Sequence, residues 1–224
     1  MSHPTDRTQG FFHQYANDFD AIYSNDRGLV NRLTNRLFRR SMRIRFEKSI
    51  EGCHPIEGKT ALDIGCGPGH YTISLAMRGA ARVLGIDFAG GMLEIARQHA
   101  EKAGVGGRCE FRTADFLEFS SAEPFDYTIA MGFMDYMPKP REVVAKVLSL
   151  TRDKAFFSFP AAGGLLAWQR QFRYRDRCEL FLYTRKQLEQ LFTGFQGIRF
   201  EIEQIDRDFF VSASVSAGAA ARAC

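Results

Sequence analysis

Leu62-Asp63-Ile64-Gly65-Cys66-Gly67-Pro68-Gly69-His70-Tyr71 is the stretch of sequence that decides the fold. It joins the short apolar run 60–64 to a segment, 71–78, whose apolar residues have helical spacing. Glycines at such a junction let the backbone approach a ligand closely and leave amide groups free at the start of a helix. Their spacing, Gly-x-Gly-x-Gly after an acid, is neither the Gly-x-Gly-x-x-Gly of dinucleotide-binding folds nor a phosphate loop ending in Lys-Ser/Thr. The stretch predicts a strand, a ligand-binding turn and a helix.

Outward from this turn, strand-like apolar runs alternate with helical patterns from Lys59 to about Phe159. Alternation of this kind predicts βαβ units and a mostly parallel sheet in an α/β fold. The expected strands are 60–64, 81–86, 110–113, 125–131 and 155–159, and the expected helices are 71–78, 91–103 and 141–150.

The rhythm of the sequence changes after Phe159. Residues 160–182 are expected to form an irregular insertion, and Thr184-Arg-Lys-Gln187 has the form of a capping box that starts a helix. Two alternating runs, Ile198–Ile205 and Asp208–Val215, are separated by two residues, which predicts an antiparallel pair at one edge of the sheet. The Ala/Gly/Ser tail, 216–224, is expected to be disordered.

The chain has 224 residues, of which 45% are hydrophobic and 25% charged, which suits one α/β domain spanning 1–224. These proportions exclude an intrinsically disordered, collagen-like or coiled-coil protein. The N-terminus lacks the apolar core of a signal peptide, and the best apolar stretch, 155–168, is interrupted by Pro160 and too short for a membrane span. Five cysteines without a CxxC pair indicate neither a zinc site nor a disulfide framework. We expect a soluble, cytoplasmic protein with free thiols.

Basic residues are concentrated in one segment of a chain whose net charge is only +4. Residues 27–48 hold eight basic residues and one acid, Glu47, in a segment with a helical pattern. Such a segment indicates an anionic neighbour: a phosphorylated acceptor, a nucleic acid, or a membrane surface to which the protein binds peripherally. A solvated basic face is the simpler interpretation. Arg45 falls apart from this face, toward the apolar side, where an arginine needs an anionic partner unless its head reaches the surface.

Four motifs in order make the chain resemble the class I S-adenosylmethionine-dependent methyltransferases. Besides LDIGCGPG, they are Gly85-Ile86-Asp87 at the end of the second strand, Ala114-Asp115-Phe116 in a later loop, and Phe125–Met131 as the fourth strand. The resemblance covers roughly residues 10–215. It implies a doubly wound, mostly parallel seven-stranded sheet over 59–215, preceded by an N-terminal helical lid in residues 1–52. The N-terminal region also resembles that of magnesium-porphyrin methyltransferases.

The resemblance implies S-adenosylmethionine as methyl donor and S-adenosylhomocysteine as product. Asp87 would accept hydrogen bonds from both ribose hydroxyls, Asp115 from the adenine amino group, and Phe116 would cover the ring face. Asp63 would face the cationic end of the methionine moiety, and Arg45, as in related quinone-biosynthesis methyltransferases, its carboxylate. Capping by Asp63 and solvated strand ends at Asp87 and Asp115 remain the alternatives. The full set implied for the cofactor is Tyr15, Arg45, Asp63, Gly65, Cys66, Gly67, Gly69, Asp87, Phe88, Met92, Asp115, Phe116 and Met131.

The acceptor side follows the fourth strand, at Met131-Gly-Phe-Met-Asp135-Tyr136. An oxygen acceptor with a high pKa needs a base, and relatives often carry Glu-His where this chain has Asp-Tyr. Asp135 is the first catalytic candidate and Tyr136 the second, with a helix-start cap as the alternative for Asp135. His70 could also reach the pocket, although a surface position is the more common outcome. No His/Cys/carboxylate cluster in the sequence suggests a metal.

Aromatic residues and arginines of the lid and of the insertion are the candidates for binding the acceptor. They are Tyr23, Trp168, Arg173 and Arg175. Aromatic residues interleaved with arginines suit an anionic, sugar-phosphate or lipid-linked acceptor, whereas lid packing and a charged surface loop are the alternatives. We therefore expect an enzyme that methylates an oxygen of a small-molecule, glycan or lipid-linked acceptor. An RNA-modifying methyltransferase and a catalytically silent cofactor-binding partner subunit stay open, although no nucleic-acid-binding module accompanies the basic segment.

Overall fold

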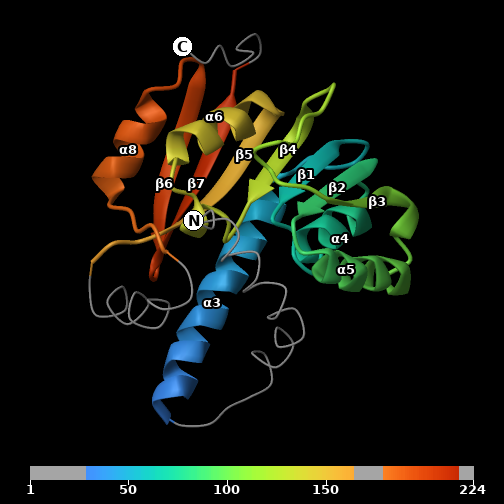
Figure 1. The fold of residues 1–224 in the computed structure, drawn as a ribbon, viewed down its shortest axis with the longest axis horizontal. Helices are drawn as coiled ribbons and strands as arrows, with labels where there is room; N and C mark the ends of the chain where they lie inside the picture. The colour runs from blue at the N-terminus through green and yellow to red at the C-terminus, as the bar shows by residue number, and fades with distance from the viewer. Residues whose placement is uncertain (1–28, 164–178, 217–224) are drawn as a thin grey trace, which may run out of the picture.

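The computed structural model describes residues 29–163 and 179–216, with the backbone alone for residues 29–39. Its centre is a seven-stranded sheet in the order β3-β2-β1-β4-β5-β7-β6, which confirms the expected number of strands (Figure 1). The strands are β1 (Thr60–Ile64), β2 (Arg82–Asp87), β3 (Cys109–Thr113), β4 (Phe125–Ala130), β5 (Thr151–Pro160), β6 (Ile198–Ile205) and β7 (Asp208–Val215).

Five described helices and two 3₁₀ turns connect the strands. They are α3 (Leu29–Gly52), α4 (His70–Met77), α5 (Gly90–Lys102), η1 (Gly106–Arg108), η2 (Met134–Tyr136), α6 (Pro140–Ser149) and α8 (Arg185–Thr193). The capping box predicted at the start of α8 is confirmed, because Thr184 Oγ1 accepts from the amide of Gln187 and the Gln187 side chain accepts from the Thr184 amide. The first part of the expected lid (1–28), most of the insertion (164–178) and the tail from residue 217 lie outside the described residues.

The topology is that of a doubly wound sheet. β2 and β3 lie on one side of β1, and β4 and β5 lie on the other, all parallel. The strand order therefore reverses between β1 and β4, and open sheets of this kind bind ligands beyond the carboxyl ends of the strands at that point. The expected antiparallel pair is also confirmed: β7 runs antiparallel to both β5 and β6, which leaves β6 at the edge.

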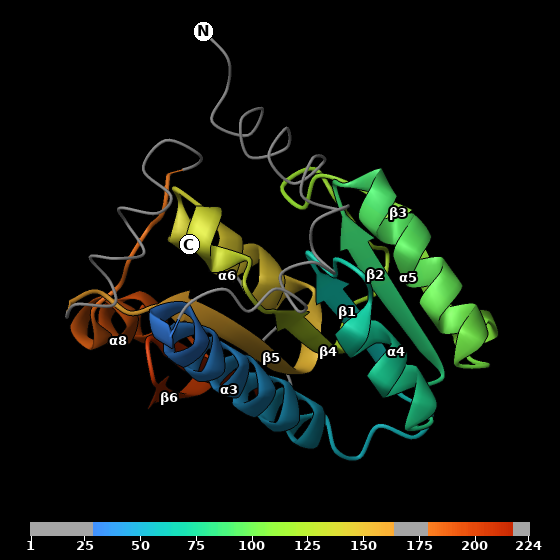
Figure 2. The same ribbon diagram turned by 90° about the horizontal axis from the view of Figure 1, so that it is seen from below.

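Helices cover both faces of the sheet (Figure 2). α6 and α8 pack on the face toward which Leu62 and Ile64 of β1 point, whereas α3 and α4 pack on the other face, toward which Ala61 points. β1 is buried on both faces and is therefore mostly apolar. After Thr60, its first residue, the only polar residue of the strand is Asp63.

α3 is longer than the sheet that it crosses. Its 24 residues span about 36 Å at 1.5 Å per residue, whereas a strand of six residues spans about 20 Å. The C-terminal half packs Ile44 and Ile50 against the sheet, and the first turns extend beyond it (Figure 1). An ion pair of 2.8 Å between Lys48 and Glu203 ties the helix to β6. None of the described helices, α3 included, is long and apolar enough to cross a membrane.

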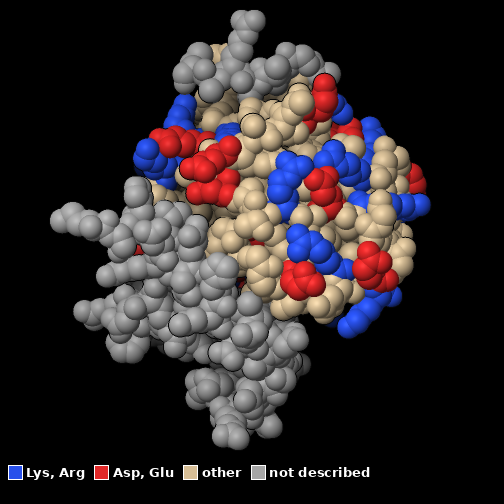
Figure 3. All heavy atoms as spheres, turned by 45° about the vertical axis from the view of Figure 1, so that its right-hand side comes forward, with Lys and Arg blue, Asp and Glu red and all other residues tan. Residues whose placement is uncertain are grey.

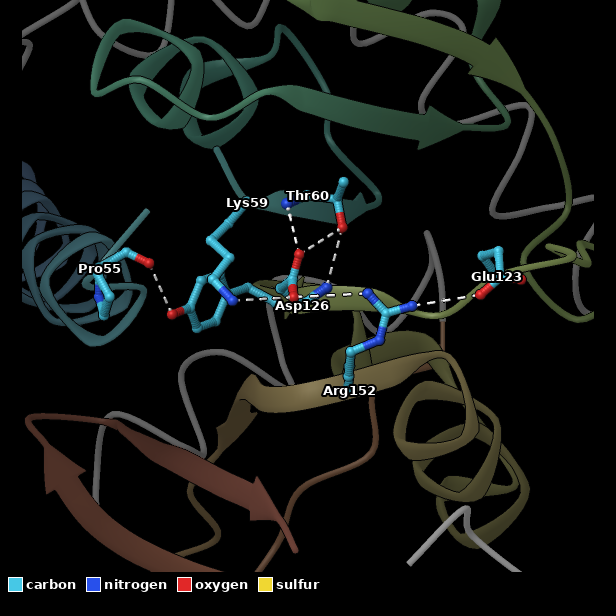
Figure 4. Close-up of polar contacts among 7 residues, drawn as sticks. Pro55, Lys59, Thr60, Glu123, Asp126 and Arg152 are labelled. Atoms are coloured by element: carbon cyan, nitrogen blue, oxygen red, sulfur yellow. Dashed lines mark hydrogen bonds and ion pairs between the residues drawn. The ribbon is translucent and has the colours of Figure 1, made fainter. Parts of the chain in front are cut away.

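A polar network around Asp126 joins three strands at the edge where the parallel strands begin (Figure 4). The Asp126 carboxylate accepts hydrogen bonds from the amide and the hydroxyl of Thr60, at 2.8 and 2.9 Å. Nitrogen atoms of Lys59 and Arg152 lie 3.5 and 3.7 Å from its other oxygen. β1, β4 and β5 are thereby fixed together at the end of the sheet that is opposite the expected ligand edge.

β5 is longer than the apolar run that predicted it. Charged residues occupy half-exposed or exposed positions in its first half, so the apolar pattern begins only at Ala155 although the strand begins at Thr151. Pro160 ends the strand, which suits a residue without an amide donor. Ala161 then forms an isolated bridge with Tyr183, so the two ends of the expected insertion lie side by side.

Candidate functional site

The turn between β1 and α4 is a left-handed glycine loop. Gly65, Gly67 and Gly69 have φ angles of 66°, 51° and 82°, which residues with a side chain rarely adopt. The amides of Gly65 and Cys66 both donate to the carbonyl of Ile86 on β2, at 2.8 and 3.0 Å, and fix the loop on the neighbouring strand. A Cβ placed on Gly67 would meet no described atom within 4 Å, so this side of the loop has room for a ligand.

Asp87 ends β2 directly beside the loop. Its Oδ2 accepts a hydrogen bond from the Gly67 amide, and its Oδ1 accepts from the Ala89 amide, both at 2.9 Å. The side chain is half-buried. The acid expected at the end of the second strand is thus held against the glycine loop by backbone amides. Its contact with ribose hydroxyls stays a prediction.

Asp63 lies beneath the loop and is 2% exposed. Its Oδ2 accepts from the amide and the hydroxyl of Thr72, at 3.1 and 2.8 Å, which caps the first turn of α4, one of the alternatives that the sequence left open. Burial raises the pKa of Asp63 to about 7, against the opposing effect of the Thr72 hydrogen bonds, and the nearby charge of Asp87 adds to the rise. Because burial disfavours its charged form, this carboxylate would gain from a cationic ligand group.

Phe133 and Phe116 adjoin the loop on the side of β4. A Cβ on Gly65 would come within 3.1 Å of Phe133 Cδ2, and the Phe116 ring meets the Phe133 ring edge-on at 5.6 Å. Phe116 is buried, and Lys146 Nζ lies 5.4 Å from its ring centroid. Asp115 Oδ1 accepts from the backbone amide two residues later, at 2.8 Å. The adenine contacts of Asp115 and Phe116 stay predictions.

η2 carries the two catalytic candidates. Asp135 is 5% exposed, and its backbone carbonyl accepts a hydrogen bond of 2.9 Å from the amide of Phe181. α6 begins at Pro140 with Lys139 as its N-cap, so Asp135 does not cap that helix. Tyr136 is half-buried. The structure thus places a buried carboxyl group after the end of β4, at the same edge of the sheet as the glycine loop.

Arg45, on α3, has an anionic partner within the protein. Its Nη1 lies 3.4 Å from Oδ2 of Asp208 at the start of β7, and the Ser41 hydroxyl donates to the same oxygen at 3.2 Å. Arg45, Asp208 and Ser41 are all buried. Asp208 pairs with Pro160, which places this contact at the carboxyl end of β5. A contact between Arg45 and the methionine carboxylate stays a prediction.

The other sequence candidates are distributed around this edge. Met92 is buried on α5, Met131 packs against the core on the α3 side, and Phe88 is half-buried after the end of β2. Burial raises the pKa of the Cys66 thiol, which keeps it protonated and unreactive. Within the described ranges, no three His, Cys, Asp or Glu side chains are grouped to hold a metal. The candidates outside the described residues are Tyr15, Tyr23, Trp168, Arg173 and Arg175.

Three residues at this edge were not singled out from the sequence: Phe133, Tyr183 and Asp208. Phe133 lies two residues before Asp135 in the same sequence motif, so this motif could have identified Phe133 as a site residue. Tyr183 is 7% exposed and packs edge-on against Phe159 at 5.0 Å. Burial and the charge of Asp135 raise the pKa of Tyr183 to about 12. No local pattern indicates that Tyr183 approaches Asp135, because the two residues lie on separate segments.

Comparison with known families and relatives identifies similar proteins. The family model described as a methyltransferase domain matches residues 56–168, which is half of the chain. A ubiquinone biosynthesis O-methyltransferase of Neisseria meningitidis is 37% identical over 112 residues, covering 49% of this chain and 47% of that protein. Its counterpart in Hahella chejuensis is 36% identical over 105 residues, covering 46% and 44%. The matched part therefore spans about half the length of these curated relatives.

Solved structures share the whole architecture at low sequence identity. The magnesium protoporphyrin IX methyltransferase of Synechocystis, crystallised with S-adenosylhomocysteine, aligns with a TM-score of 0.72 and 18% identity over 96% of this chain and 100% of that one. The cyclase SpnF aligns with a TM-score of 0.69 and 15% identity, over 94% and 96% of the two chains. At such identities the likeness describes the fold alone.

Proposed function

This chain belongs to the class I S-adenosylmethionine-dependent methyltransferases, and from that premise we propose that it transfers the methyl group to an oxygen of a small-molecule acceptor. S-adenosylmethionine is its methyl donor and S-adenosylhomocysteine its product. The choice of oxygen rests on the buried carboxyl group of Asp135, with support from relatives whose name is O-methyltransferase.

The described residues fit S-adenosylmethionine. The positive-φ glycine loop has an open side at Gly67, and the carboxylate of Asp87 lies beside it, where a ribose can donate two hydrogen bonds. Asp63, beneath the loop, would face the ammonium group of the methionine moiety. When bound, S-adenosylmethionine supplies a methyl group on a positively charged sulfur. The chain's own task is then to position the acceptor in line with that methyl group and to remove the acceptor's proton.

Asp135 is the group that we assign to removing the proton. It is buried and lies in η2, after the end of β4. Phe133, the N-cap residue of η2, lies beside Gly65 of the glycine loop. A base within reach of a hydroxyl contributes about a hundredfold to ten-thousandfold to the rate. Tyr136 is more exposed and stands second.

The acceptor that we propose is a small molecule, by analogy with relatives whose names place them in ubiquinone biosynthesis. Glycan or lipid-linked acceptors, and contact of the basic segment with a membrane surface, have no support among the described contacts. On the face in Figure 3 basic and acidic side chains are interspersed, and Arg82 and Arg112 both pair with Glu110. The described residues on this face therefore form no basic patch of the kind that binds RNA.

Transfer of label from tritiated S-adenosylmethionine tests the proposal. Incubation with cell extract should place the label in small molecules, as esters or ethers, and not in RNA, glycan or lipid fractions. Asp135→Asn should lower the transfer about a hundredfold or more without weakening S-adenosylhomocysteine binding. Glu142→Gln, an exposed acid on α6 paired with Lys139, is the matched control and should transfer label as the wild type does. Label in RNA, or binding without any transfer, would contradict the proposal.

A further inference from the structure

Tyr183 is held in a fixed place at the carboxyl end of β5. Its amide donates to the carbonyl of Pro160 at 2.8 Å, and its own carbonyl accepts from the amide of Ala162 at 2.7 Å. Its ring meets Phe159 edge-on, with centroids 5.0 Å apart. β1, β4 and β5 are adjacent parallel strands, so their carboxyl ends lie at the same edge of the sheet. Tyr183, at the carboxyl end of β5, therefore lies at the same edge as the glycine loop, which is the expected ligand edge.

The hydroxyl of Tyr183 has no hydrogen-bond partner in the part of the chain that the structure describes. The residue is 7% exposed, and buried tyrosine hydroxyls usually have a partner because burying an unpaired polar group costs free energy. Tyr127, the comparable tyrosine at the opposite edge, follows the rule: it is fully buried, and its hydroxyl donates to the carbonyl of Pro55 at 3.0 Å. A phenylalanine would fill the Tyr183 position with the same ring and without this cost.

Asp135 is the charged neighbour of this hydroxyl. The amide of Phe181, two residues before Tyr183, donates to the Asp135 carbonyl at 2.9 Å, which ties the two segments together. The charge of Asp135 acts on the phenol and, with burial, raises the pKa of Tyr183 to about 12. The hydroxyl therefore stays protonated at neutral pH and can donate a hydrogen bond.

We propose that Tyr183 binds the acceptor, its Oη donating a hydrogen bond to the acceptor oxygen that receives the methyl group. The inference rests on the proposed function. It implies that the acceptor carries a hydroxyl group and that this group is bound between the side chains of Asp135 and Tyr183. In the transfer, the oxygen forms the new bond to the methyl carbon, and the sulfur keeps the electron pair of the broken carbon–sulfur bond. Asp135 takes the hydroxyl proton, while Tyr183 keeps its own and stabilises the charge that develops on the oxygen.

The test compares Tyr183→Phe with the matched variant Tyr127→Phe. Tritiated S-adenosylmethionine is the donor, and a dilution series of the small-molecule fraction of cell extract supplies the acceptor. Tyr183→Phe should keep or raise the melting temperature, bind S-adenosylhomocysteine as the wild type does, and need about tenfold more extract for half-maximal transfer, the loss expected for one hydrogen bond. Tyr127→Phe should lower the melting temperature and leave the half-maximal amount of extract unchanged.

Each other result overturns the inference for a different reason. A fall in the melting temperature of Tyr183→Phe shows that the hydroxyl has a partner within the protein. Weaker binding of S-adenosylhomocysteine to Tyr183→Phe assigns the residue to the cofactor. Transfer by Tyr183→Phe that equals the wild type at every dilution shows that the hydroxyl does not touch the acceptor. Absence of transfer by the wild type itself refutes the proposed function, and the inference with it.

Discussion

Asp87 and Gly67, twenty residues apart in the sequence, are joined by a hydrogen bond of 2.9 Å from the Gly67 amide to Asp87 Oδ2. The other carboxylate oxygen is held by the Ala89 amide. A carboxylate offers about four acceptor sites, so two amides fix its orientation and leave capacity for the hydroxyls of a ribose. One side chain thus orders the glycine loop and presents the acceptor atoms for a ligand lying on it.

Asp87→Ala should weaken the binding of S-adenosylhomocysteine about tenfold to a hundredfold, because a hydrogen bond to a charged acceptor contributes about 1.5–3 kcal/mol. Asp87→Asn should lose less, since its amide oxygen still accepts hydrogen bonds. Titration calorimetry measures both. Glu110→Ala, which removes an exposed acid of the adjacent strand, should bind as the wild type does. An unchanged affinity in Asp87→Ala would remove this residue from the cofactor site.

Asp63→Asn should stabilise the protein without ligand at alkaline pH. Burial raises the native pKa of Asp63 to about 7 from an ordinary value of 3.8, so the native state retains a proton that the unfolded state loses. Stability therefore falls as the pH rises between these two values and is level above them. Asparagine keeps an oxygen for the Thr72 hydrogen bonds and carries no charge. Denaturation as a function of pH should give a gain on the order of a few kcal/mol at alkaline pH, since one pKa unit is about 1.4 kcal/mol, and almost none near pH 4.

The same Asp63→Asn variant should bind S-adenosylhomocysteine more weakly, because it can no longer attract the ammonium group. If the variant has a higher free energy of unfolding and a lower affinity for S-adenosylhomocysteine, the carboxylate of Asp63 contributes to ligand binding at the expense of stability. Equal stability at all pH values would show that the native pKa is not raised.

Arg45→Ala should lower the free energy of unfolding by about 3–5 kcal/mol, because it removes one partner of the buried ion pair with Asp208. Arg43→Ala is the matched control: this arginine lies on the same helix and forms an exposed pair with Glu47, so its loss should change stability little. Urea denaturation measures both variants. Because Arg45 Nη1 already pairs with Asp208, we expect the main effect on stability and a smaller one on S-adenosylhomocysteine affinity. A loss of about tenfold, 1.4 kcal/mol, would instead assign Arg45 to the methionine carboxylate.

Asp126→Asn should destabilise the protein at neutral pH by about 1.5–3 kcal/mol, the range for a hydrogen bond to a charged group. Burial acts to raise the pKa of Asp126, but the Thr60 hydrogen bonds and the Lys59 charge outweigh it and lower the pKa below its ordinary value of 3.8. This stabilisation is present above pH 3.8 and is lost as the pH falls through the native pKa, so the deficit of the variant should shrink there.

The position of Asp126 at the far edge of the sheet predicts that S-adenosylhomocysteine binding survives the change. Glu123→Gln alters the exposed neighbour that pairs with Arg152 and should leave stability unchanged. A loss of affinity in Asp126→Asn would show that the two edges are coupled.

Much of the fold could be predicted because its signals are local. The alternation of apolar runs and helical patterns, the glycine turn at 65–69 and the capping box at Thr184 each depend on residues a few positions apart, and the structure has all of them. The early start of β5 could not be predicted, because its first residues, Thr151–Lys154, are mostly charged and extended only through their pairing with β4 and β7.

The site divides in the same way. Asp63 and Asp87 were found because each lies at the end of a strand beside glycines. Asp208 and Tyr183 were not found, since each is brought to the site by a partner far away in the chain, Arg45 and Pro160 respectively. A single sequence carries no sign of a contact between segments that lie so far apart.

The place of β7 has a consequence for the order in which the protein is completed during synthesis. β7 follows β6 in the chain but lies between β5 and β6, so β6 has no neighbour until β7 has been made. Asp208 of the same strand anchors Arg45 and Ser41 of α3, which left the ribosome long before. α3 therefore lacks this buried partner until β7 has been made. The contact between Arg45 and Asp208 can form only after residue 208 has been synthesised, when every other strand of the sheet is already present in the chain.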